Sequence, residues 1–224
     1  ENMDSILLEL EVEEVIIALE PFEHDRIGDI VSRLSLLDVG ISAIPSMTDI
    51  LTGKVKSSTI FGTPLLEVSH ELMPAWQQNV KQLLDILLAI FSLILLLPLI
   101  LVLTIGVKLS SPGPVFYKQS RVGKFGREFY IFKFRSMYHD RPPEDKTVQA
   151  TKDDPRITKV GNFIRRTSLD ELPQLINVVN GTMSLVGPRP HAVDHNKEYG
   201  AVILGYFARH RVKPGITGWA QVNG

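Results

Sequence analysis

Two adjacent carboxylates, Asp170 and Glu171, are the residues whose types and spacing are best suited to chemistry. Such a pair at the start of a helix can hold a divalent metal ion and can also supply an oxygen nucleophile. A structural interpretation competes with this one. Ser168 stands three residues before Glu171 in a capping-box pattern, and acidic side chains favour a helix N-terminus. The local pattern leaves both interpretations open.

Arginines flank this carboxylate pair in the sequence. Arg165 lies five residues before Asp170, and Arg189 follows between two prolines in Gly187–Pro190. A guanidinium group matches the geometry of phosphate oxygens, and the prolines would stiffen the loop that carries Arg189. An ordinary loop arginine would have the same sequence. His191 and His195 are four residues apart, but no third ligand is evident, so the sequence does not predict a zinc site.

A long uncharged segment is the strongest physical signal in the chain. The 22 residues from Ile86 to Val107 carry no charge, and as a helix they would extend roughly 33 Å, enough to cross a hydrocarbon core of about 30 Å. Pro98 lies just past their middle, where it would break the helix. Because basic residues gather after the segment, a re-entrant hairpin that keeps both ends on one face is favoured over a straight span.

The charge is divided unevenly along the 224-residue chain. Residues 1–80 hold 4 basic and 14 acidic side chains, whereas residues 81–224 hold 20 basic and 11 acidic ones. The basic part favours anionic partners, and the preceding apolar segment makes lipid headgroups the expected partner, not nucleic acid. The chain has no cysteine, which excludes disulfides and cysteine-ligated metal sites.

The N-terminal part predicts an α/β unit. Residues 12–19 and 41–44 have the composition of buried strands, and residues 24–38 carry apolar side chains at helical spacing. This order predicts a parallel βαβ unit, followed by a last short strand at 65–68. The pattern resembles the back half of a Rossmann-like domain, but it lacks a glycine-rich phosphate loop.

Residues 81–224 resemble the bacterial sugar transferases, the monotopic polyprenyl-phosphate phosphoglycosyl transferases. Six blocks match in the family's order: Lys108–Val115, Lys133–Met137, Asp154–Thr158, Arg166–Gln174, Met183–Pro190 and Val212–Gln221. The resemblance implies four parts: the end of a Rossmann-like domain (1–70), a linker (71–81), a re-entrant helix broken by proline (82–108) and a mostly α, membrane-associated catalytic domain (109–224). We expect the chain to be part of a longer protein.

The resemblance also implies a reaction. The family moves a sugar-1-phosphate from a nucleotide diphosphosugar onto a polyprenyl phosphate and releases a nucleoside monophosphate. If the roles of the family's Asp–Glu pair are transferred to this chain, the resemblance implies that Asp170 is the nucleophile. It also implies that Glu171, together with Asp170, holds Mg²⁺. Arg165 and Arg189 match arginines expected around the phosphates. The remaining candidates, Lys133 and Arg135, match a basic strip suited to the lipid phosphate.

Further expectations concern the membrane and the donor. Many family members have serine before the break proline, but here Leu97 precedes Pro98. The segment Pro190–Asn196 resembles members that transfer glucose-1-phosphate from UDP-glucose to undecaprenyl phosphate in exopolysaccharide, capsule or O-antigen assembly. UDP-galactose is the alternative donor, and a non-catalytic membrane scaffold is the alternative function. The family implies the cytoplasmic face of the bacterial inner membrane and suggests a homodimer.

Overall fold

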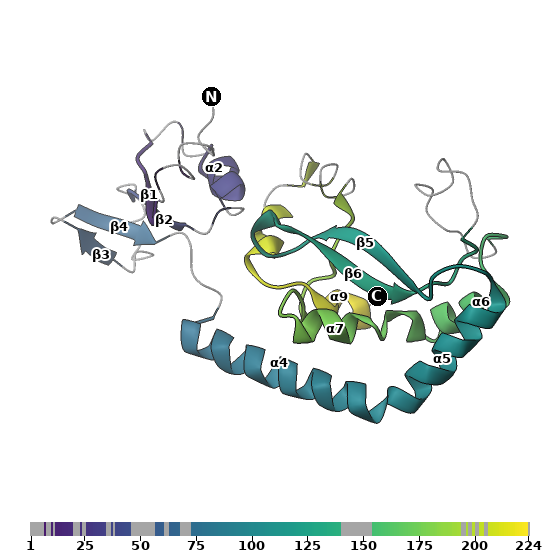
Figure 1. Cartoon of the computed structure of the whole chain (residues 1–224). Coiled ribbons are helices and arrows are strands. Elements are labelled where there is room, and N and C mark those ends of the chain that lie inside the picture. The colour runs from purple at the N-terminus through teal and green to yellow at the C-terminus, as the bar shows by residue number, and fades with distance from the viewer. Residues whose placement is uncertain are drawn as a thin grey trace. The chain divides into compact units, whose positions relative to one another are not determined.

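The structure, a computed structural model, forms two compact units (Figure 1). It describes residues 73–139, 154–193 and 206–223 without interruption, and before residue 73 mainly 12–19, 26–34, 39–45, 57–60 and 63–67. The first unit comprises Glu1–Gln77 with Lys124–Arg127 and Asp194–Val212. The second comprises Gln78–Gly123, Glu128–Val193 and Lys213–Gly224.

The first unit contains a four-stranded mixed sheet in the order β1-β2-β4-β3. Strands β1 (Glu14–Ile17) and β2 (Gly40–Ala43) are parallel, and helix α2 (Ile27–Leu34) lies between them in the sequence, which confirms the predicted βαβ order. Strand β4 (Thr63–Glu67) covers the strand expected at 65–68, except for residue 68, which lies outside the described residues.

The remaining strand of this sheet, β3 (Ser57–Ile60), is absent from the sequence prediction. It pairs antiparallel with β4, which is itself antiparallel to β2. The hairpin therefore extends the parallel pair into a mixed sheet.

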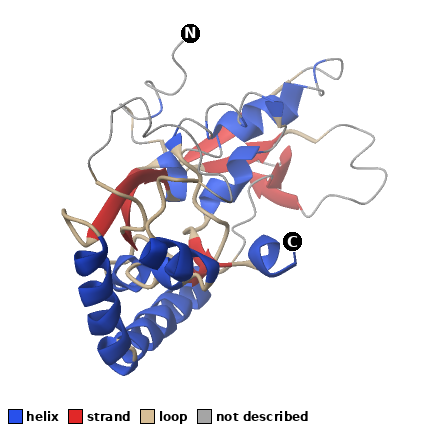
Figure 2. Ribbon diagram, turned by 90° about the vertical axis from the view of Figure 1, so that its right-hand side faces the viewer, coloured by secondary structure: helices blue, strands red, loops and turns tan. Residues whose placement is uncertain are grey.

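Helices α4 (Ala75–Leu95) and α5 (Leu97–Ser110) form the apolar part of the second unit. They are separate rods that meet at an angle (Figures 1 and 2). The interruption is at Leu96, two residues before Pro98, so the proline falls in the first turn of α5. A first-turn N–H has no intrahelical acceptor, so proline costs nothing there. No side chain caps this helix start, in agreement with the missing serine.

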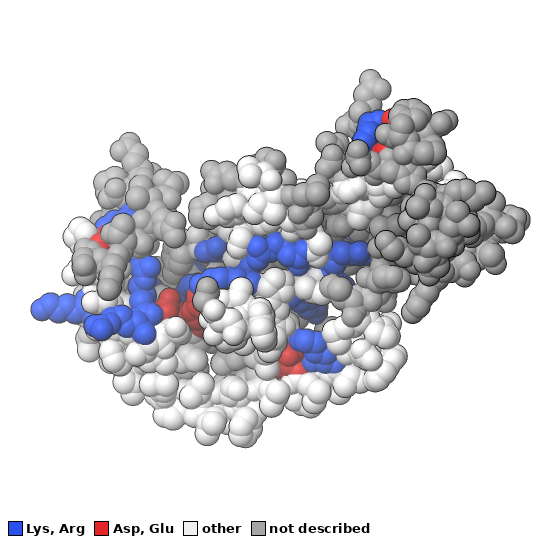
Figure 3. Space-filling model, turned by 180° about the vertical axis from the view of Figure 1, so that it is seen from behind, with Lys and Arg blue, Asp and Glu red and all other residues white. Residues whose placement is uncertain are grey.

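One of these helices, α4, is long and apolar enough to cross a membrane. It begins at Ala75, before the expected residue 82. Leu87, Phe91 and Val102 are all more than half exposed, and the surface of the helix pair is largely free of charge, with Lys and Arg side chains gathered beside it (Figure 3). An exposed apolar surface of this size is typical of a membrane or protein interaction site.

The polar side of the second unit is built on an antiparallel hairpin of β5 (Phe116–Val122) and β6 (Glu128–Phe134). The short turn η2 (Lys124–Gly126) lies between them in the sequence and belongs to the first unit. Its helical elements are α6 (Lys159–Arg166), the 3₁₀ turn η4 (Leu169–Glu171), α7 (Gln174–Val179) and α9 (Trp219–Asn223). Strands β7 (Ser184–Val186) and β8 (Gly215–Thr217) pair in parallel. Helices thus predominate, with two short sheets.

Two apolar clusters attach the helix pair to this polar side. Ala89 of α4 packs with Ile131 of β6 and Val178 of α7. In the second cluster, Val107 of α5 packs with Phe134 of β6 and Ile164 of α6, among others. Strand β6 contributes to both clusters, so it contacts both helices of the pair.

Candidate active site

The carboxylate pair lies in the turn between α6 and α7. Thr158 is the N-cap of helix α6, and its hydroxyl accepts a hydrogen bond from the N–H of Gly161 at 2.8 Å, as expected at this position. The helix ends at Arg166, and Ser168 then adopts a left-handed conformation with φ 57°. Such a conformation is rare for serine. It turns the chain sharply just before Asp170.

The capping hydrogen bond predicted from Ser168 and Glu171 is not formed. Ser168 makes no side-chain hydrogen bond to the turn that follows it, because its left-handed backbone differs from the extended conformation that an N-cap requires. The side chain of Glu171 points instead to basic residues. The structure therefore removes the simplest structural explanation for the pair.

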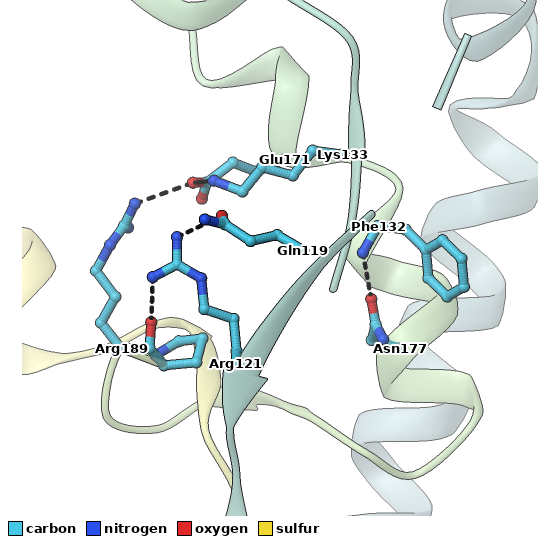
Figure 4. Close-up of polar contacts among 8 residues, drawn as sticks. Gln119, Arg121, Phe132, Lys133, Glu171, Asn177 and Arg189 are labelled. Atoms are coloured by element: carbon cyan, nitrogen blue, oxygen red, sulfur yellow. Dashed lines mark hydrogen bonds and ion pairs between the residues drawn. The ribbon is translucent and has the colours of Figure 1, made fainter. Parts of the chain in front are cut away.

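Glu171 receives two cations on one oxygen atom. Its Oε1 accepts from Lys133 Nζ at 2.7 Å and from Arg189 Nη2 at 3.1 Å (Figure 4). The side chains of Lys133 and Glu171 are about one-fifth exposed, whereas that of Arg189 is half exposed. Burial pushes the pKa of Glu171 upward, but Lys133 and Arg189 outweigh it and leave this pKa below its ordinary value. Glu171 is therefore held ionised.

Asp170 has the opposite shift. Burial raises the pKa of its carboxyl group above the ordinary value, and the charge of Glu171 adds to this effect. Lys133 and Arg165 oppose the rise without cancelling it. Two neighbouring carboxyl groups with pKa values moved apart are suited to different roles. The more basic Asp170 fits a nucleophile, and the ionised Glu171 fits an electrostatic or metal-binding role.

A pocket opens beside Glu171. Its polar lining consists of Arg121, Lys133, Glu171, Gln174 and Arg189, while Asp170 is not among the lining residues. Three cationic side chains against one carboxylate make this pocket electropositive, as a site for a polyanion requires. The structure thus brings Lys133, Glu171 and Arg189 together, with Asp170 and Arg165 close enough to interact electrostatically.

Arg121 is a pocket residue that the sequence reasoning missed. Its guanidinium donates to the carbonyl of Pro190 at 3.2 Å and to Gln119 Oε1 at 2.7 Å (Figure 4). Burial and the nearby charge of Arg189 lower its pKa. The alternation of side chains along β5 could have indicated this residue, since Gln119 and Arg121 are two positions apart and lie on the same face of the strand.

Asn177 on α7 was also missed, and it positions the strand that carries Lys133. Its side-chain oxygen accepts from the N–H of Phe132 at 3.0 Å (Figure 4). Its amide donates to the carbonyl of Tyr130 at 2.7 Å. Only 2% of Asn177 is exposed. The amide group therefore pairs with the edge of β6 as a neighbouring strand would.

Arg135, expected near the lipid phosphate, does not line the pocket. It is 6% exposed and donates to the carbonyls of Ser111 at 2.6 Å and Pro112 at 2.8 Å. A third donation reaches the carbonyl of Val107 at 3.4 Å. These contacts bind the C-terminal end of α5.

Two glycines support the loop that carries Arg189. A Cβ atom at Gly215 would collide with the backbone nitrogen of Gly187, and one at Gly187 would lie 2.5 Å from the carbonyl oxygen of Lys213. Only glycine lets the two backbones approach so closely. The parallel pairing of β7 with β8 then fixes the start of the Arg189 loop.

The carboxylate pair suits Mg²⁺ that arrives with a phosphate ligand. Among the described residues, no group of three or more acidic, histidine or cysteine side chains could enclose a metal ion. Both cations occupy Oε1 of Glu171, and its Oε2 accepts no hydrogen bond from a described residue. One or two carboxylates completed by substrate phosphates is the usual arrangement for Mg²⁺ in proteins.

Comparison with known proteins identifies the class. Residues 76–224 match the family model of the bacterial sugar transferases. The chain belongs to this family of transferases.

Curated relatives extend the match to nearly the whole chain. A UDP-glucose:undecaprenyl-phosphate glucose-1-phosphate transferase of Xanthomonas campestris pv. campestris is 46% identical over 96% of this chain and 45% of its own length. The enzyme of the same name from Escherichia coli K12 is 45% identical over 95% of this chain and 46% of its own. A UDP-N-acetylgalactosamine-undecaprenyl-phosphate N-acetylgalactosaminephosphotransferase of Aeromonas hydrophila is 40% identical over 86% of this chain and 44% of its own. The chain thus spans about half the length of these relatives.

Proposed function

We propose that the protein transfers glucose-1-phosphate from UDP-glucose to undecaprenyl phosphate and releases UMP. The observation that carries this proposal is the Asp170–Glu171 pair, whose pKa values are moved apart beside an electropositive pocket. The names of the Xanthomonas and Escherichia relatives support the donor and the acceptor. The exposed apolar helix pair in the same unit supports a lipid substrate.

Asp170 is the proposed nucleophile. An oxygen of its carboxylate forms a bond to the β-phosphorus of UDP-glucose while the bond from that phosphorus to the bridging oxygen breaks, and UMP leaves with the electron pair. An oxygen of undecaprenyl phosphate then attacks the same phosphorus, and the bond to Asp170 breaks. The raised pKa of Asp170 supports this role, since a more basic carboxylate is a better nucleophile.

The basic residues neutralise the phosphoryl oxygens. Lys133 and Arg189 already converge on the site, and Arg165 acts on Asp170. Phosphoryl transfer depends mainly on positioning and charge stabilisation, which such cations provide. Glu171, with Asp170, would hold Mg²⁺ on the diphosphate, where the ion would further neutralise the charge that develops.

The membrane arrangement is part of the proposal. Helices α4 and α5 would enter and leave the cytoplasmic face of the bacterial inner membrane as a re-entrant hairpin, with the break before Pro98 at its deepest point. The basic side chains beside the apolar surface suit anionic headgroups (Figure 3). We further propose a Rossmann-like domain over residues 1–70, a linker at 71–81, within which α4 begins, and a homodimer.

The test is the release of UMP by the full-length protein in detergent with undecaprenyl phosphate and Mg²⁺. UDP-glucose, UDP-galactose and UDP-N-acetylgalactosamine are compared, the last because the Aeromonas relative uses it by name. We expect acceptor-dependent UMP from UDP-glucose and none after chelation of Mg²⁺. UMP from another donor alone would correct the sugar. No UMP from any donor, with folded protein, would favour a scaffold.

A further inference from the structure

Polar contacts join α4 to the catalytic side of the second unit. We call Lys81, Asp85 and Ser184 the α4 anchor. Asp85 Oδ2 lies 2.7 Å from Lys81 Nζ and 2.7 Å from Ser184 Oγ, and Lys81 also donates to Ser184. The side chain of Asp85 is 14% exposed and Ser184 is 4% exposed. The cluster therefore brings a largely buried carboxylate and its lysine partner against strand β7.

The position of the α4 anchor on the helix is informative. Asp85 is the last charged residue before the uncharged segment that starts at Ile86. The anchor thus marks the boundary between the polar and apolar parts of α4. Its partner Ser184 begins β7, which pairs with β8 and leads to Arg189 five residues later.

A second set of polar contacts holds the end of α5. We call Arg135 with the carbonyls of Val107, Ser111 and Pro112 the α5 anchor. The last carbonyls of a helix have no intrahelical partner, and a cation at this end is favourable. Arg135 follows β6 directly and lies two residues after Lys133. The guanidinium therefore satisfies the helix end from the strand that contributes Lys133.

The α4 anchor attaches α4 to strand β7, which leads to Arg189. The α5 anchor attaches the end of α5 to the segment that follows β6, the strand that carries Lys133. Lys133 and Arg189 are the two cations that contact Glu171. Apolar contacts alone would specify this register weakly, because lipid chains are as apolar as the side chains of α4 and α5. Polar contacts at the two ends have no equivalent in lipid, so they fix the register.

We infer that the two anchors are positioning elements that set the depth of the helix pair relative to Lys133 and Arg189. The phosphate of an acceptor held in the bilayer then arrives at the height of the pocket. The inference rests on the proposed polyprenyl-phosphate acceptor. The anchors determine where the acceptor phosphate lies relative to the pocket. They do not determine the structure of the pocket, which β-strand pairing and Asn177 hold in place.

The test compares acceptors of different length. Ser184→Ala removes one hydroxyl of the α4 anchor. Ser92→Ala is the matched control, since Ser92 lies on α4 and its side chain makes no hydrogen bond to a described residue. Full-length protein is assayed in bilayer nanodiscs with undecaprenyl phosphate, and in detergent with a short, water-soluble polyprenyl phosphate. Loss of a partly buried charge-assisted hydrogen bond should raise the KM for undecaprenyl phosphate about fivefold to tenfold.

The KM for the UDP-sugar and the KM for the short acceptor should stay within about twofold, because neither depends on helix depth. Ser92→Ala should change none of these values. An unchanged KM for undecaprenyl phosphate in Ser184→Ala, or an equal rise for both acceptors, would overturn the inference. A wild-type protein without acceptor-dependent UMP release would instead refute the proposed function, so the two failures are distinguishable.

Discussion

Replacing Asp170 and Glu171 one at a time by their amides should affect the stability of the fold differently, because only Glu171→Gln should lower it. Glu171→Gln removes the charge that Lys133 and Arg189 share at 2.7 and 3.1 Å. The Lys133 contact is largely buried, and the Arg189 contact is half exposed and worth little. A charge-assisted hydrogen bond contributes about 1.5–3 kcal/mol. We therefore expect a loss of about 2 kcal/mol, or roughly 4–8 °C in Tm for a chain of this size.

Asp170→Asn should leave the Tm unchanged or raise it. A carboxyl group whose pKa is raised by folding stabilises the fold below its unfolded pKa, and this contribution is lost as pH rises through the folded pKa. At pH 7 the ionised Asp170 therefore costs stability, which the neutral amide removes. The lowered pKa of Glu171 has the opposite sign, since its contribution is present at neutral pH and is lost as pH falls through the folded pKa.

Thermal unfolding in detergent, followed by tryptophan fluorescence at pH 7 and at more acidic pH, measures both effects. The difference between wild type and Glu171→Gln should shrink on acidification. Both variants should lose UMP release, Asp170→Asn completely. A Tm of Asp170→Asn well below that of Glu171→Gln would refute the assignment of the two carboxylates, because it would make Asp170 the structural member of the pair.

Three further predictions concern the surroundings of the pair. Arg165→Ala removes a cation that lowers the pKa of Asp170, so the acid limb of the pH–activity profile should move to higher pH; an unmoved limb would exclude this coupling. Gly187→Ala adds a Cβ atom 2.5 Å from the Lys213 carbonyl oxygen and should lower activity at least about tenfold, whereas Gly106→Ala on α5, whose Cβ has room, should keep full activity. Pro98→Ala should straighten the helix pair, so that cysteine labels placed after residue 108 react from the opposite face; unchanged labelling would show that Pro98 does not determine topology.

The sequence predicted those parts of the fold that depend on local periodicity. The parallel strands around α2 and the interruption of the apolar helix both follow from patterns within about twenty residues. Local periodicity does not predict the exact residue at which the apolar helix is interrupted. The interruption falls at Leu96 because Pro98 is tolerated in a first helical turn but not in the middle of a helix.

The site was predicted where a residue's chemistry is visible locally, and missed where it depends on distant contacts. Lys133, Glu171 and Arg189 do converge, but the left-handed Ser168, which replaces the expected cap, is set by tertiary context. Nothing in the local sequence distinguishes Asn177 from an ordinary helical residue. Its role depends on hydrogen bonds to the backbone of β6, which is distant in the sequence. The side chain of Arg135 has the chemistry of a phosphate ligand. Only the folded chain shows that its guanidinium donates to backbone carbonyl oxygens.

The parallel pairing of β7 with β8 has a consequence for the order in which the protein is made. Strand β8 lies about 30 residues after β7 in the chain, so the contact is non-local and cannot form until β8 has been synthesised. Gly215 and Ile216 of β8 also line the pocket. A growing chain folds from its N-terminal side, so the apolar helix pair leaves the ribosome well before the pocket can close. In the proposed membrane arrangement, α4 and α5 therefore reach the bilayer before the pocket is complete.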